Sequence, residues 1–160
     1  MQVRWLIKRD MDEVLTIDDD SFADPWTVSQ FYQYLRQRNC IGCVVERDRK
    51  VIGFMLYELH ESSLRIINLA VAPNERSRGA GRAMIQRLIN KLSRQKRRSI
   101  EYEIRETNLL GQLFLSACGF RAVDILRDNY EDGDGYVMRY ELEAELSDRH
   151  NRISHLFGNA

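Results

Sequence analysis

Hydrophobic and polar residues alternate along much of this chain, and the period of the alternation predicts most of its secondary structure. A two-residue period, typical of strands, occurs in residues 2–8, 40–47, 51–60, 64–71, 99–105, 120–126 and 136–142. A period of three to four residues, typical of helices, occurs in residues 11–22, 28–37, 82–97 and 109–118. Thr27 and Gln30 form a capping-box pair at the start of the second helix, and Gly119 is placed to end the fourth.

The order of these segments predicts a single α/β domain. A strand, two helices, three strands, a helix, a strand, a helix and two strands follow one another without a linker, a repeat or a low-complexity stretch. The gaps within residues 40–71 are short enough for antiparallel hairpins, so we expect a mixed, mostly antiparallel sheet flanked by helices. We expect this domain to cover residues 1–142, followed by a polar, helical tail over residues 143–160.

The composition is that of an ordinary globular protein. The chain has 160 residues, of which 44% are hydrophobic and 30% are charged, and this is enough for one substantial core. The longest apolar runs are far shorter than a membrane span, and the N-terminus becomes charged too early for a secretory signal. These observations predict a cytoplasmic protein without a membrane partner.

The formal net charge is zero, but the charges are distributed unevenly. Residues 76–98 hold nine Arg and Lys and no acid. Residues 10–24 hold seven acids and no base, and residues 128–148 hold eight acids and one base. A zero total can therefore hide one positive site within negative surroundings, although each run alone is also compatible with a solvated helix face.

Cys40 and Cys43 form a C-x-x-C pair, and Cys118 is the third cysteine. A redox pair opens a helix, where the dipole lowers the pKa of a thiol, but here a strand-like run follows. A zinc site requires a second pair of ligands, and the three histidines show no ligand spacing. We therefore expect three thiols in a reducing compartment, no metal site and no catalytic histidine.

The segment RSRGAGRAM, residues 76–84, joins a predicted strand to a predicted helix. The first turn of a helix leaves backbone N–H groups without partners, and its dipole favours negative charge. Glycines let a bulky anion approach that backbone and arginines neutralise it, so the segment predicts a phosphate or pyrophosphate site. The spacing of Gly79 and Gly81 fits neither the P-loop, G-x-x-x-x-G-K-[ST], nor the dinucleotide fingerprint, G-x-G-x-x-G.

This R-x-x-G-x-G loop, which follows a strand ending in V-x-P, resembles the acetyl-CoA-binding motif of the GNAT superfamily of N-acetyltransferases. Over about residues 2–142 the sequence is similar to the branch of ribosomal-protein-alanine N-terminal acetyltransferases. The stretches that carry this similarity are FADPWT at 22–27, INLAVAP at 67–73, YEIRETN at 102–108, ACGF at 117–120 and RDNYEDGDGYVM at 127–138. The resemblance implies an enzyme that moves the acetyl group of acetyl-CoA to a primary amine, without a metal cofactor.

The resemblance also implies roles for individual residues. Glu103 matches the general base of the family, and Trp26 and Tyr130 match positions on the acceptor side. The backbone of three strand residues would pair with the pantetheine arm, the loop after them would hold the pyrophosphate, and an asparagine would hydrogen-bond near the thioester. These cofactor-binding residues are Leu69, Ala70, Val71, Arg76, Ser77, Arg78, Gly79, Ala80, Gly81, Arg82 and Asn108.

The residue pattern alone gives Glu103 two interpretations. Glu101, Glu103 and Arg105 alternate with apolar residues on a strand that should lie inside the sheet, where an unpaired carboxylate costs free energy. One interpretation is a Glu–Arg ladder on a partly wet face, with Arg105 as a partner. The other is chemical, because an ammonium ion must lose a proton before it attacks a thioester, and a carboxylate whose pKa is raised by burial can accept that proton.

One position departs from the family pattern. In the family, a tyrosine four residues before the glycine of G-F protonates the leaving sulfur, but here that position is Leu115, which has no proton to donate. Tyr130 is our candidate acid, and Tyr102 is an alternative. Water is another, because a thiol with a pKa near ~8.5 is a tolerable leaving group. The remaining alternative is a protein that binds acetyl-CoA and turns over poorly.

A negative rim formed by residues 10–24 and 128–148 would attract a cationic acceptor. The resemblance favours the N-terminal α-amine of a protein, such as a ribosomal protein, while polyamines, aminoglycosides and lysine side chains stay open. Two other functions also stay open: an acyl-CoA-binding regulatory module, and RNA binding through the basic residues 82–98. Because that charge can serve the phosphates of coenzyme A, we do not expect nucleic acid as a partner.

Overall fold

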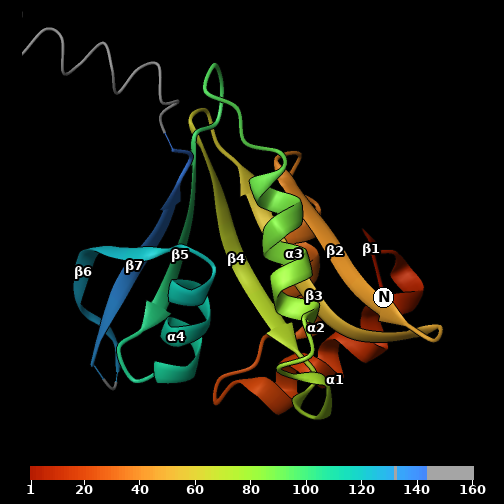
Figure 1. Ribbon diagram of the computed structural model, residues 1–160. Helices are drawn as coiled ribbons and strands as arrows, with labels where there is room; N and C mark the ends of the chain where they lie inside the picture. Colours follow the sequence, from red (N-terminus) through yellow and green to blue (C-terminus); the bar gives the residue numbers. More distant parts are fainter. Residues whose placement is uncertain (132, 144–160) are drawn as a thin grey trace, which may run out of the picture.

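The computed structural model describes residues 1–131 and 133–143, which form one seven-stranded sheet with helices on both faces (Figure 1). The strands lie in the order β1-β2-β3-β4-β5-β7-β6. All neighbours are antiparallel except β4 and β5, which are parallel. The strands are β1 (Gln2–Trp5), β2 (Cys40–Arg47), β3 (Lys50–Leu59), β4 (Ser63–Val71), β5 (Ser99–Arg105), β6 (Arg121–Tyr130) and β7 (Gly133–Glu141). The predicted α/β domain with a mostly antiparallel sheet is confirmed.

The helices occupy the four predicted segments. They are α1 (Met11–Ser21), α2 (Val28–Leu35), α3 (Ala80–Ile89) and α4 (Leu109–Ala117), with short 3-10 turns η1 (Lys8–Asp10) and η2 (Pro73–Glu75). The capping box of α2 is confirmed, because Thr27 N–H donates to Gln30 Oε1 at 2.8 Å and Gln30 N–H donates to Thr27 Oγ1 at 3.2 Å.

The predicted C-terminal end of α3 is wrong. The helix ends at Ile89 instead of residue 97, and the chain turns into a loop. In that loop, Ser93 N–H donates to the Arg97 carbonyl at 2.8 Å, and Arg98 N–H donates to the Ser62 carbonyl at 3.1 Å. Hydrogen bonds to the β3–β4 hairpin therefore replace those that a longer helix would have made.

Two hydrophobic clusters hold the helices against opposite faces of the sheet. Helices α1 and α2 cover one face, and α3 and α4 cover the other. Fully buried members of the first cluster include Val14, Phe31, Val44, Phe54 and Leu56, and those of the second include Met84, Ile85, Leu88, Ile100 and Leu115. Full burial of such side chains stabilises the fold by roughly 1.5–3 kcal/mol each, so this packing fixes the position of the strands between the two layers.

The sheet opens between β4 and β5. The two strands pair only from Ser63 opposite Ser99 to Ile66 opposite Tyr102, and then diverge toward their C-terminal ends (Figure 1). Beyond a bulge at Ile67, the segment Leu69–Val71 still pairs with β3 but has no strand on its other side. This leaves a free backbone edge of β4 facing an opening in the middle of the sheet.

The cysteines are free thiols, and burial raises the pKa of both Cys40 and Cys43 to about 11. Among residues 1–131 and 133–143, no group of three or more His, Cys, Asp or Glu side chains could hold a metal ion. None of the helices in these same ranges is long and apolar enough to cross a bilayer. The helical tail predicted over residues 143–160 lies, from residue 144 onward, outside the described residues.

Candidate active site

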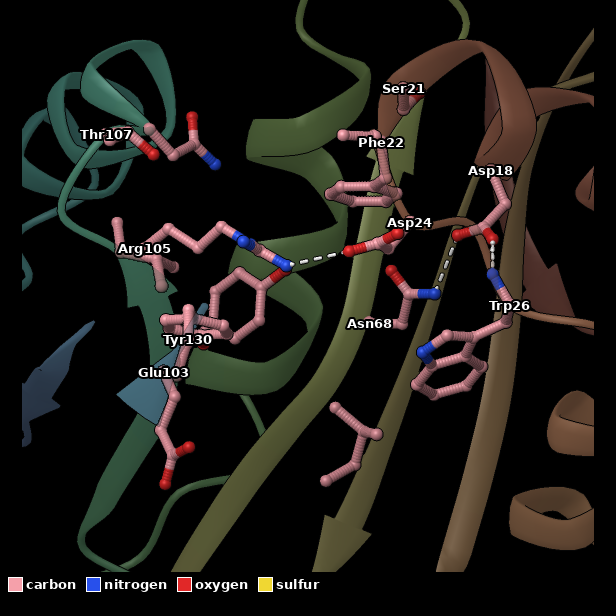
Figure 2. Close-up of a pocket in the computed structure, with 15 residues that line it drawn as sticks. Asp18, Ser21, Phe22, Asp24, Trp26, Asn68, Glu103, Arg105, Thr107 and Tyr130 are labelled. Atoms are coloured by element: carbon pink, nitrogen blue, oxygen red, sulfur yellow. Dashed lines mark hydrogen bonds and ion pairs between the residues drawn. The ribbon is translucent and has the colours of Figure 1, made fainter. Parts of the chain in front are cut away.

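A pocket of about 340 Å³ lies at the opening between β4 and β5. Its walls come from the end of α1 and the loop after it, from β4 and β5, from the start of α4 and from the end of β6 (Figure 2). Four of the predicted site residues line this pocket: Trp26, Glu103, Asn108 and Tyr130. The fold thus brings together predicted site residues from three distant parts of the sequence.

Glu103 lies on β5 and is one of the residues that line the pocket. The carboxylate points away from the Arg105–Asp24 pair (Figure 2) and forms an ion pair with the guanidinium of Arg65 on β4. Its neighbour Glu101 accepts two hydrogen bonds from Arg139, at 2.7 and 3.0 Å. A Glu–Arg ladder is therefore present, but Arg65 rather than Arg105 is the partner of Glu103.

Asp18 is the buried carboxylate of the pocket. It is 1% exposed, and its two oxygens accept hydrogen bonds from Trp26 N–H at 2.7 Å and from the Asn68 amide at 2.8 Å (Figure 2). Burial raises the pKa of Asp18, and the two hydrogen bonds partly oppose that rise. The same hydrogen bonds fix the loop after α1 against β4, so Asp18 shapes the acceptor side of the pocket.

Aromatic rings form the remaining walls. Trp26 stacks on Tyr34 with ring centroids 4.8 Å apart, which holds it at the pocket rim. Across the pocket, the Arg105 guanidinium lies 4.3 Å from the centre of the Tyr130 ring and 3.4 Å from Asp24. Such a cation–π contact orients both side chains. Tyr130 therefore faces the pocket from a fixed position.

The segment predicted to bind phosphate, residues 76–82, consists of a loop and the first residues of α3, which begins at Ala80. Ser77 and Gly79 have φ values of 61° and +91°, and no side chain caps the N–H groups at the start of the helix. Arg78 is largely exposed, whereas Arg76 folds back to donate to the Val71 carbonyl and to Ser21 Oγ, both at 3.0 Å. The donors of the first helical turn remain available to a phosphate group.

Glycine at position 81 is explained by packing. A Cβ atom there would lie 2.9 Å from Cζ of Phe114 on α4. The close approach brings the start of α3 and the side of α4 together next to the free edge of β4. Ala80, the residue before it, is 1% exposed and belongs to the core.

The start of α4 is held by Asn108, whose Oδ1 accepts a hydrogen bond from Gly111 N–H at 2.9 Å. The Asn108 side chain also lines the pocket, as its predicted role near the thioester requires. Leu115 lies about two turns further along the same helix and is 1% exposed within the core. The position of the family tyrosine is thus filled by a packing residue.

Sequence reasoning did not single out three residues of this site: Asp18, Asn68 and Arg65. Asp18 had a detectable signal, because it lies four residues after Val14 on the apolar face of α1, where a carboxylate requires partners. Asn68 had none, because its burial depends on contact with α1. Arg65 had none either, because its pairing depends on the register between β4 and β5.

The sheet opens between two parallel strands, a glycine-containing loop starts the next helix, and a pocket lies at the opening, as expected for an acyl-CoA-dependent transferase. The family model of the acetyltransferase (GNAT) family matches residues 11–120, so the chain belongs to this family. The predicted family is therefore confirmed.

Two curated proteins and one solved structure are similar to this chain over most of its length. A Methanocaldococcus jannaschii protein described as an uncharacterized N-acetyltransferase is 29% identical over 139 residues, covering 86% of this chain and 89% of that protein. A Bacillus subtilis protein described as a putative [ribosomal protein bS18]-alanine N-acetyltransferase is 25% identical over 139 residues, covering 85% and 92%. The crystal structure of the ribosomal-protein-S18-alanine N-acetyltransferase from Escherichia coli shares the fold, with a TM-score of 0.79, 21% identity and coverage of 90% and 95%.

These comparisons make the chain an N-acetyltransferase whose acetyl donor is acetyl-CoA. They do not assign individual residues. The roles of Glu103, Tyr130, Trp26, Asn108 and the cofactor-binding residues stay predictions.

Proposed function

We propose that this protein acetylates the N-terminal α-amine of a protein in the cytoplasm, and that a ribosomal protein is the acceptor. The observation that supports this proposal is the pocket at the open end of β4 and β5, whose lining residues include three acids, Asp18, Asp24 and Glu103, and one basic residue, Arg105. Such a lining attracts a cationic N-terminus. The names of the Bacillus and Escherichia relatives support the same acceptor class.

The proposed reaction is a direct attack. An α-ammonium group enters from the side of α1 and α2, and Glu103 takes one of its protons, directly or through a water molecule. The neutral amine then attacks the thioester carbonyl of acetyl-CoA, whose pantetheine arm lies along the free edge of Leu69–Val71. The C–S bond breaks with its electron pair moving to sulfur, the nitrogen loses its second proton to solvent water as the amide forms, and coenzyme A leaves as a thiolate. The ion pair with Arg65 holds Glu103 at the pocket wall before the amine arrives.

A panel of acceptors tests this proposal. The first peptide carries a free N-terminal alanine followed by basic residues, the second has the same sequence with a blocked N-terminus and an internal lysine, and the third acceptor is a polyamine. With isotope-labelled acetyl-CoA, we expect label on the α-amine of the first peptide and little on the other two. Preferential labelling of the lysine or the polyamine would contradict the proposed acceptor while leaving the acetyltransferase chemistry in place.

A further inference from the structure

Tyr102 lies where β4 and β5 separate. It is the last residue of β5 that pairs with β4, opposite Ile66, and its side chain lines the pocket. The backbone N–H of Leu69, on the free stretch of β4, lies near enough to lower the pKa of the Tyr102 hydroxyl and so partly offsets the effect of burial. The phenol therefore reaches across the opening from one strand to the other.

The O–H group of this phenol can act as a hydrogen-bond donor. As long as the phenol keeps its proton, it can donate one hydrogen bond to a further group in the opening. Burial raises the pKa of Tyr102 well above its ordinary value, so the group is a neutral phenol at every physiological pH. The other titratable groups around the pocket are Asp18 on α1, Asp24, Glu103, Arg105 and Tyr130 on β6.

The free edge of β4 determines what meets this hydroxyl. An extended chain can add to an unpaired strand edge by main-chain hydrogen bonds. A pantetheine arm that starts at the phosphate loop before α3 and follows Val71 and then Leu69 runs toward Tyr102. The thioester at its end would enter the opening between β4 and β5. Leu115, buried on α4, offers no polar group there.

We propose that the Tyr102 hydroxyl donates a hydrogen bond to the coenzyme A sulfur as the thiolate leaves; the proposal rests on the proposed acetyl transfer. When the C–S bond breaks, its electron pair moves to sulfur, and the O–H of Tyr102 stabilises the developing negative charge. The ammonium group gives one proton to Glu103 before the attack and the second to solvent water as the amide forms. The thiolate takes its own proton from water, and Tyr102 keeps its proton throughout.

Tyr102 is better suited to donate a hydrogen bond to the leaving thiolate than to transfer its proton to it. A free thiol has a pKa near ~8.5, below that of an ordinary phenol near ~10. Burial widens this difference, so transfer of the proton from Tyr102 to a thiolate is uphill. A hydrogen bond to a charged acceptor needs no such transfer and is stronger than one between neutral groups.

The test is Tyr102→Phe, which keeps the ring and removes the hydroxyl. Loss of one hydrogen bond to a charged group predicts a fall in kcat of about 10- to 100-fold, with the KM for acetyl-CoA and for the peptide nearly unchanged. The matched control is Tyr57→Phe, which removes a buried phenol hydroxyl from β3, outside the pocket. We expect the control to keep the kcat of the wild type.

A second readout separates this role from a structural one. The acetyl ester of seleno-coenzyme A has a more acidic leaving group, which requires less stabilisation. We expect the kcat penalty of Tyr102→Phe to shrink strongly with this donor. An equal penalty with both donors, or a rise in KM without a fall in kcat, would overturn the proposal.

The two proposals can fail separately. If the wild type acetylates the N-terminal peptide and Tyr102→Phe has the same kcat, the role of Tyr102 is refuted and the proposed function stands. If the wild type acetylates no α-amine but does acetylate another acceptor, the proposed function is refuted. The variant is then compared with the wild type on that acceptor, where an unchanged kcat would still overturn the role of Tyr102.

Discussion

Replacing Glu103 by glutamine distinguishes a general base from one half of an ion pair. Glutamine keeps the shape and much of the hydrogen bonding of glutamate, but it cannot accept a proton at pH 7. A general base typically contributes 10²–10⁴-fold to the rate. We therefore expect kcat on an N-terminal alanine peptide to fall by about 10²-fold or more. Binding of acetyl-CoA should be spared, because the predicted cofactor contacts lie on β4, on α4 and in the loop before α3.

The effect of Glu103→Gln on stability should be small. The side chains of Glu103 and Arg65 are 34% and 41% exposed, and ion pairs with this solvent access contribute about 0–1 kcal/mol. A loss of ~1 kcal/mol lowers the Tm of a domain of this size by roughly 2–4 °C. The variant should therefore remain folded at assay temperature, and its loss of activity can be attributed to chemistry.

Glu101→Gln is the matched control. Glu101 lies two residues earlier on the same strand, is 29% exposed and pairs with Arg139, but it does not line the pocket. The two variants should share a similar small shift in Tm, measured by thermal melting, and similar affinity for acetyl-CoA, measured by calorimetry. Only Glu103→Gln should lose turnover, measured by release of free thiol. Near-normal turnover of Glu103→Gln would contradict the role of Glu103 as general base and leave the Glu–Arg ladder as the reason for the glutamates on β5.

Three further predictions concern stability. Leu115→Tyr adds volume to a closed core and should lower the free energy of unfolding by about 1–3 kcal/mol, measured by urea titration; unchanged stability would show that the core has space there. Asp18→Ala leaves its two buried donors without an acceptor, at about 1–3 kcal/mol each, and should also raise the KM for the peptide; an unchanged KM would remove Asp18 from the acceptor side. Arg4 lowers the pKa of Asp10 below 3.8, mainly through a hydrogen bond. The Arg4–Asp10 pair therefore contributes its full stabilisation above pH 3.8, and this contribution is lost as the pH falls through the folded-state pKa of Asp10. The difference in unfolding free energy between wild type and Asp10→Asn should accordingly be largest at pH 7 and shrink below pH 3.8, and a constant difference would contradict the assignment.

The sequence predicted the order of strands and helices because hydrophobic periodicity is local information. The strands at residues 40–47 and 99–105 were predicted with their observed bounds. The end of α3 could not be predicted in this way. Its apolar face continues to Leu92, so the periodicity extends beyond Ile89, but the helix ends at Ile89 and the loop after it bonds to the β3–β4 hairpin at Arg98. That contact joins residues far apart in the sequence.

The same limit applies to the site. The glycine loop could be predicted as a phosphate site from residue type and spacing, because its chemistry lies in one short segment. Glu103 was singled out by the resemblance to the family, since the residue pattern alone left a Glu–Arg ladder open. The partner of Glu103 could not be predicted, because Arg65 reaches it only through the parallel pairing of β4 with β5. The position of Tyr102 across the opening depends equally on where these strands diverge, which no short segment specifies.

The central claim is that acetyl groups move from acetyl-CoA to the N-terminal α-amine of a protein. The most direct measurement incubates the protein with isotope-labelled acetyl-CoA and a deacetylated lysate of its source organism, and locates the label by mass spectrometry. We predict label on the N-terminal residue of a ribosomal protein, absent with Glu103→Gln and present with Glu101→Gln. Label confined to lysine side chains or small amines, or no label while acetyl-CoA still binds, would contradict the claim.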